Sequence, residues 1–307
     1  MADLATPMAA FVLGAALARA NSCTVASARR LVVDGRPDWL LGLWIAIGWA
    51  GLTMAGFSLA LPQVVVLPAQ LQVGWPVILG AMIMGLGATM NKGCFLGSVA
   101  GLGRGDLAYL FTLVGIALAL AVVPASSQPV PIGAIEDKTE FHRSSSVLII
   151  GVVLFAPLAV LGIWRWWRLR QQPVLALILV GVAGGTVYAC NPDWSYTSGL
   201  RRVIVSGIEA NTVLVEGAAI AVVAGVVTSA IAGGSFRLRQ PGFRTAALHL
   251  VGGMLMATGA LLVPGGNDTL MLWAIPGMTL YGLVAYVIMV GTIMVLLAAH
   301  RHLRTGR

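Results

Sequence analysis

Long apolar runs that recur along the whole chain constrain its fold more than any other feature of the sequence. Each run approaches the ~20 apolar residues that a helix needs to cross a hydrocarbon core ~30 Å thick. Only 10% of the 307 residues are charged, whereas a soluble domain carries about 25%. A soluble protein with buried helices would need polar loops much longer than those between these runs. The sequence therefore predicts an all-α integral membrane protein.

We expect nine membrane segments in a single transmembrane domain that occupies residues 1–307. Their approximate bounds are 5–21, 39–61, 75–93, 105–124, 147–165, 174–190, 212–232, 247–265 and 274–299. The longest polar stretch, residues 126–146, falls between the fourth and fifth segments. Its near-neutral charge favours the periplasmic side of a membrane.

Arginine clusters between the apolar runs predict the orientation of the chain. They lie at 165–170, 237–244 and 301–307, and basic loops tend to stay in the cytoplasm. Alternating the segments from these anchors puts the N-terminus outside and the C-terminus inside, with Arg201 and Arg202 as an exception on the outer side. The net charge of +8 therefore reflects topology. No nucleic-acid-binding motif accompanies it, and we expect no nucleic-acid partner.

A short run rich in glycine and alanine, ending in a break that contains asparagine, occurs four times. The breaks are Asn21-Ser22-Cys23, Asn91-Lys92-Gly93-Cys94, Cys190-Asn191 and Gly265-Gly266-Asn267-Asp268. We expect each break to be followed by a longer apolar helix. The four asparagines are 70, 100 and 76 residues apart, so corresponding breaks in the two halves of the chain are 170 and 176 residues apart.

This spacing predicts a duplication. The halves are residues 1–124 and 174–299, joined by a polar loop at 125–146 and a linking helix at 147–165. An odd number of joining spans reverses the second half relative to the first, which is the inverted-repeat architecture of many secondary transporters. The alternative is that a glycine-rich membrane protein offers such matches by coincidence.

The breaks matter because irregular backbone is tolerated at membrane depth only where it is buried in protein or lines a wet cavity. The helix that follows a break begins with unpaired N–H groups, which attract anions together with the helix dipole. Four such ends converging from both sides would form a narrow polar waist between two funnels. We therefore expect broken helices that meet at the midplane in an hourglass arrangement.

Three of the breaks also carry a resemblance. The stretch from Asn91 to Ser98, with Arg104-Gly105-Asp106 behind it, resembles the signature loop of the YeeE/YedE family of sulfur-compound transporters. The segments Pro264–Leu270 and Arg19–Ala26 are similar to the last and first loops of that family. The similarity covers nearly the whole chain apart from the polar stretch at 126–146.

The resemblance implies uptake of thiosulfate, or of a related small sulfur species, across the bacterial inner membrane. It implies that Cys94 is the central substrate contact and Cys23 a second one, and that a TusA-like cytoplasmic sulfur carrier is a partner. Thiosulfate-type members place a cysteine near the last loop, where this chain has none, and Cys190 lies in the third loop instead. This shifted cysteine set leaves the identity of the sulfur compound open.

The chemistry of the residues leaves several roles open. An uncharged thiol at Cys94 suits a sulfur anion, an ionised one would attack a sulfane sulfur, and a buried cysteine is otherwise inert packing. Lys92 either attracts the anion or lies at the cytoplasmic edge, and the asparagines either cap the following helices or donate amide hydrogens to the substrate. The residues that we expect to bind substrate are Cys94, Cys23, Cys190, Lys92, Asn91 and Asn267.

We expect no enzyme activity and no cofactor. We also expect no metal site, because His249, His300 and His302 lack ligand partners at workable spacing. The function that the sequence predicts is transport of a small sulfur-containing anion, thiosulfate, past central cysteines. Two alternatives stay open. The first is a membrane sulfur-transfer protein that carries a persulfide on Cys94, and the second is an anion channel in which the cysteines are incidental.

Overall fold

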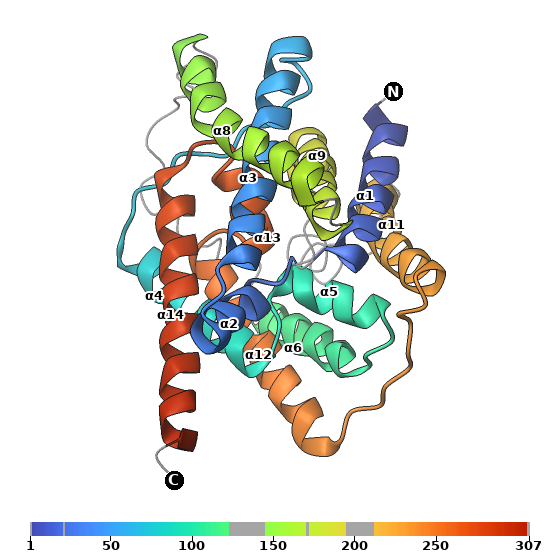
Figure 1. Ribbon diagram of the computed structural model, residues 1–307, viewed down its shortest axis with the longest axis vertical. Coiled ribbons are helices and arrows are strands. Elements are labelled where there is room, and N and C mark those ends of the chain that lie inside the picture. The colour runs from blue at the N-terminus through green and yellow to red at the C-terminus, as the bar shows by residue number, and fades with distance from the viewer. Residues whose placement is uncertain (1, 21, 123–144, 170–171, 195–211, 306–307) are drawn as a thin grey trace.

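The computed structural model describes residues 2–20, 22–122, 145–169, 172–194 and 212–305, and over these ranges it contains helices and no β-strand. In Figure 1, α1 begins near one end of the long axis and α14 ends at the other. In chain order the elements are α1 (Ala2–Arg19), α2 (Thr24–Asp34), α3 (Asp38–Ala60), α4 (Trp75–Met90), α5 (Phe95–Gly103), α6 (Ala108–Val122), α8 (Ser145–Leu169), α9 (Gln172–Cys190), η1 (Pro192–Trp194), α11 (Thr212–Ala232), α12 (Phe243–Leu262), α13 (Asn267–Thr269), η2 (Leu270–Ala274) and α14 (Leu280–Thr305).

Seven apolar stretches of this part of the chain are long enough to cross a membrane. They are Thr6–Asp34, Asp38–Ala60, Trp75–Gly103, Ile149–Arg168, Pro173–Cys190, Phe243–Leu262 and Leu280–Leu303. Two shorter apolar helices, Ala108–Val122 and Gly217–Ala232, lie where the fourth and seventh segments were expected. The protein is therefore a multi-pass membrane protein. The count of nine spans is not confirmed by the seven stretches found in the described part of the chain.

The helices that follow the first two breaks differ from the expectation. We expected longer apolar helices there, but α2 has 11 residues and α5 has 9, which corresponds to about 14–17 Å at 1.5 Å per residue. Helix α2 carries Arg29, Arg30 and Asp34, whose charges oppose burial in lipid. Helix α5 ends before Arg104, and the next residue, Gly105, has a left-handed φ of 94°. Both helices therefore extend only part of the way across a membrane.

Helices α4 and α12 pack in antiparallel orientation through pairs of glycines. A methyl group added at Gly80 would lie 2.9 Å from the backbone oxygen of Gly259, and one added at Gly87 would lie 2.7 Å from that of Gly252. In the reverse direction, a methyl group at Gly252 would lie 2.9 Å from the oxygen of Gly87, and one at Gly259 would lie 2.5 Å from that of Gly80. Small residues let membrane helices approach this closely. The duplication itself stays a prediction.

Helix α5 is surrounded by parts of both halves. It contacts α1 and α6 from the first half, and α11 and α13 from the second. The residue before α5 is Cys94, and 1% of its surface is exposed. The fold thus encloses the second break on several sides.

Candidate functional site

Two cysteines from different breaks lie next to each other. Cys23 is the N-cap residue of α2 and Cys94 is the N-cap residue of α5. Their sulfur atoms are 4.0 Å apart although the residues are separated by 71 positions. The backbone N–H of Thr24 donates a hydrogen bond to the sulfur of Cys94 at 3.4 Å. Both thiols therefore lie at helix N-termini, where the backbone favours negative charge.

The turn between α4 and α5 places Cys94. The N–H of Gly93 donates to the carbonyl of Ala88 at 3.1 Å, and Lys92 takes a left-handed φ of 55°. This combination ends a helix and reverses the chain sharply. As a result the side chain of Lys92 is exposed while that of Cys94 is buried.

The turn that ends α12 follows the same plan. The N–H of Gly265 donates to the carbonyl of Ala260 at 2.9 Å, and Pro264 has a positive φ of 28°. Gly266 then serves as the N-cap of α13, in the place that Cys94 takes before α5. This match supports the equivalence of the second and fourth breaks.

Asn91 does not cap the helix that follows it, so the capping alternative is wrong for this residue. It is the C-cap residue of α4. Its amide group donates to the carbonyl of Gly93 and to the hydroxyl of Ser98, both at 2.8 Å, and its side-chain oxygen accepts from Thr112. Because Asn91 is fully buried and bonded on both sides, it holds the second break in shape. It remains predicted as a substrate-binding residue.

Asn267 also caps a different helix from the one expected. The N-cap residue of its own helix α13 is Gly266, which has no side chain and so makes no side-chain cap bond. The side-chain oxygen of Asn267 instead accepts from the N–H of Phe95, the first residue of α5, at 2.9 Å. Its amide nitrogen is buried and has no hydrogen-bond partner in the part of the chain that the structure describes. A spare buried donor therefore lies beside the N-terminus that carries Cys94.

A basic cavity of about 380 Å³ adjoins the cysteine pair. Four cationic side chains and one carboxylate line it, so its lining carries an excess of positive charge. Cys23 is on its wall, whereas Cys94 lies behind Cys23 and does not line it. The lining residues are Cys23, Ala26, Lys92, Gly97, Gly101, Arg104, Asp106, Tyr109, Ser235, Arg237 and Arg239.

The segment between α11 and α12 closes one side of this cavity. The N–H of Arg237 donates to the carbonyl of Arg104 at 2.8 Å, and that of Arg239 donates to the carbonyl of Gly105 at 2.8 Å. The guanidinium of Arg104 donates to the carbonyl of Ala18 at 2.7 Å, at the C-terminal end of α1. Arg104 thus joins α1 to the wall of the cavity. The sequence indicated the arginine cluster at 237–244 only as a cytoplasmic anchor.

Gly97 makes room for the two thiols, and sequence reasoning did not single it out. A methyl group added there would lie 2.6 Å from the sulfur of Cys23 and 3.6 Å from that of Cys94. Cys94 and Gly97 are separated by about one turn of α5. A glycine one turn after a cysteine N-cap is the signal that could have indicated this position.

Cys190 is not part of the cysteine pair. It is the last residue of α9 and is partly buried. The nearby Tyr188 donates to the carboxylate of Asp268 at 3.0 Å, so the third break meets the fourth. Three residues of the sequence argument, Asn21, Arg201 and Arg202, lie outside the described residues.

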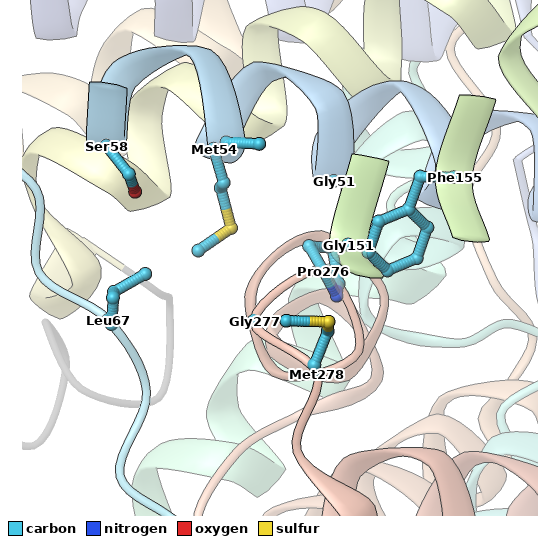
Figure 2. A pocket seen from close by; sticks show the side chains of 10 residues that line it. Gly51, Met54, Ser58, Leu67, Gly151, Phe155, Pro276, Gly277 and Met278 are labelled. Atoms are coloured by element: carbon cyan, nitrogen blue, oxygen red, sulfur yellow. The ribbon is translucent and has the colours of Figure 1, made fainter. Parts of the chain in front are cut away.

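A second cavity is apolar and much smaller. Its volume is about 30 Å³, and Figure 2 shows Met54, Phe155 and Met278 around it, with the hydroxyl of Ser58 nearby. No charged side chain lines it. An anion therefore finds favourable charge in the basic cavity and none here.

Comparison with known proteins agrees with the resemblance carried by the breaks. The sequence model of a family described as "Sulphur transport" matches residues 19–178 and again residues 139–295, which together span nearly the whole chain. A search of curated proteins found no match. The chain belongs to this sulphur-transport family, the YeeE/YedE family.

Proposed function

We propose that this protein carries a small sulfur-containing anion, thiosulfate, into the bacterial cytoplasm along a path that passes Cys94 and then Cys23. The family membership supports a sulfur-compound transporter. The single observation that carries the finer proposal is the pair of N-cap thiols, with sulfur atoms 4.0 Å apart beside a basic cavity.

The cavity gives the path its inner mouth. Under the positive-inside rule the segment with Arg237 and Arg239 faces the cytoplasm. Lys92 and these arginines concentrate anions locally, since a cleft lined by one sign of charge focuses its field. An anion that leaves Cys23 enters this cavity. The acceptor that the family resemblance implies there is a TusA-like sulfur carrier.

The cysteine pair supplies weak, soft contacts. An uncharged thiol is a weak donor with a polarizable sulfur, and the N-termini of α2 and α5 add favourable dipoles. A conducting site must bind well enough to admit an ion and weakly enough to release it. Two thiols within reach of each other meet this demand, because the anion passes from one to the next without full release.

Asn267 is proposed as the third contact. Its amide nitrogen is a buried donor without a partner among the described residues, and leaving such a donor unbonded costs about 1–3 kcal/mol. An oxygen of the anion at Cys94 would accept from it. Cys190 lies outside this pair and makes no direct contact in the proposal.

Reconstitution tests the proposal. Purified protein in liposomes should take up radiolabelled thiosulfate above the level of protein-free liposomes. Unlabelled thiosulfate should compete strongly and sulfate weakly, because sulfate lacks a terminal sulfur for the thiols to contact. Equal competition by sulfate would indicate an anion path in which the cysteines are incidental.

The same sample separates transport from sulfur transfer. Intact-mass analysis after exposure to thiosulfate should show unmodified Cys94. An added sulfur atom on Cys94 in every active preparation would indicate a persulfide intermediate instead.

A further inference from the structure

The cysteine pair has the geometry of a dithiol that is able to close. The two sulfur atoms are 4.0 Å apart, and a disulfide requires about 2.05 Å. Closure therefore requires the two sulfur atoms to approach by about 2 Å, through side-chain rotation together with any small backbone shift. Both sulfurs also face the space that Gly97 leaves free, so no side chain of α5 separates them.

The two thiols differ in access. Cys23 is partly exposed and lines the basic cavity, whereas Cys94 is 1% exposed and lies behind it. A reagent in the cavity therefore meets Cys23 first. The positive lining, with Lys92, Arg237 and Arg239, favours anionic reagents over neutral ones.

We propose that Cys23 and Cys94 react with anions that contain a sulfur–sulfur bond between sulfane atoms, such as tetrathionate, and close to a disulfide. This is a thiol–disulfide exchange activity at the cysteine pair, with Cys23 as the attacking thiol and Cys94 as the resolving thiol. The exchange rests on the geometry alone. Its consequence for transport, a closed path, rests on the proposed function.

The chemistry balances in two steps. The sulfur of Cys23 attacks one inner sulfur of tetrathionate, the central sulfur–sulfur bond breaks, and thiosulfate leaves with the electron pair while a proton passes to water. Cys23 then carries a sulfenyl-thiosulfate group. The sulfur of Cys94 attacks the sulfur of Cys23, a second thiosulfate leaves, and a second proton is released. Two thiols are oxidised to a disulfide, and one tetrathionate is reduced to two thiosulfates.

The disulfide would close the path because both sulfurs that pass the anion are then bonded to each other. Neither retains an S–H donor. The oxidised form of the proposed substrate would therefore block the transporter, and a reducing environment would reopen it.

Mass spectrometry of purified full-length protein tests the exchange without any transport assay. After treatment with tetrathionate, the protein should lose two hydrogen atoms, and a peptide pair joined through Cys23 and Cys94 should appear. Dithiothreitol should restore the original mass. Protein that keeps a stable thiosulfate adduct on Cys23, with no joined peptides, would overturn the proposal.

Three variants test the order of the steps. Cys94→Ser should stop at the adduct on Cys23, and Cys23→Ser should leave the buried Cys94 unmodified over the same time. Gly97→Ala keeps both thiols but displaces the sulfur of Cys23, and it should slow closure strongly. Rapid modification of Cys94 in the Cys23→Ser protein, or unchanged closure in the Gly97→Ala protein, would contradict the assigned roles.

Transport measured on the same samples distinguishes the two proposals. If tetrathionate forms the disulfide and thiosulfate uptake falls to background until dithiothreitol is added, both stand. If the disulfide forms while uptake continues, the exchange stands and the proposed path past the cysteines fails. Cys190→Ser should form the joined peptides as the native protein does, because Cys190 takes no part in the pair.

Discussion

Asn267 accepts a hydrogen bond from the backbone N–H of Phe95 at 2.9 Å, across 172 residues of sequence. Phe95 is the first residue of α5, whose early N–H groups have no partner within their own helix. The N-cap residue Cys94 itself makes no side-chain cap bond. A residue far along the chain therefore supplies the cap that fixes the helix end next to Cys94.

Replacing Asn267 should cost stability. The variant Asn267→Ala leaves the buried N–H of Phe95 without its acceptor but also removes the unbonded amide nitrogen of Asn267, so the free energy of unfolding should fall by about 1 kcal/mol. Denaturant or thermal unfolding in detergent measures this change. The control is Thr258→Ala, whose exposed hydroxyl donates only to the carbonyl of Met254 and should change stability by less than about 0.5 kcal/mol. Equal stability of the two variants would show that the cap contributes nothing.

The close approach of α12 to α6 should not tolerate a side chain at Gly253. A methyl group there would overlap the backbone of Thr112, so Gly253→Ala should destabilise the protein by about 1–3 kcal/mol. Gly291 in α14 has no atom within 4 Å of the corresponding position. Gly291→Ala should therefore be neutral or stabilise by up to about 1 kcal/mol, because alanine favours a helix. The ratio of folded to aggregated protein after heating compares them, and matched losses would refute the packing argument.

Reversing one charge in the basic cavity should weaken anion capture. Lys92→Glu should slow thiosulfate exchange at low substrate by about tenfold, measured in inside-out membrane vesicles that expose the cavity to the buffer. The defect should shrink in high salt, since the Debye length falls from ~10 Å at 0.1 M to ~3 Å at 1 M. Arg36→Glu makes the same change in charge at an exposed loop position outside the cavity. An equal defect in both variants would mean that net charge matters and the cavity does not.

The breaks could be predicted from the sequence because their signals are local. A glycine-rich apolar run that stops at Asn91 or at Gly265 is visible within a few residues, and so are the cysteines beside the breaks. The positions of most long helices follow from hydropathy in the same way. The short helices α2 and α5 were missed as separate elements, because one carries arginines and the other is too brief to stand out.

The correspondence between the second and fourth breaks stays a prediction, and the turns favour an alignment different from the one that the asparagines gave. Aligning Asn91 with Asn267 gives a separation of 176 residues, whereas the turns that place Cys94 and Gly266 are 172 residues apart. The backbone of the two turns favours this second alignment, through the positive φ of Lys92 and Pro264. The asparagines are not equivalent, since one holds its own turn and the other caps a helix of the opposite half.

Long-range packing decides which cysteines meet, and the sequence contains no local signal for it. The resemblance named Cys94 and Cys23 as contacts, but the residues themselves gave no reason to pair these two thiols and to leave Cys190 apart. The pairing depends on α2 and α5 beginning at the same place, with Thr24 donating to the sulfur of Cys94. The role of Gly97 becomes visible only once that pair is known.

The substitution Cys94→Ser, compared with Cys190→Ser, tests the central claim most directly. Serine is small and a favourable N-cap residue, so α5 should keep its start while the central sulfur is lost. Uptake of radiolabelled thiosulfate into proteoliposomes should fall close to the protein-free level for Cys94→Ser and stay near the native rate for Cys190→Ser. Native uptake by the Cys94→Ser protein would contradict a path that depends on this thiol.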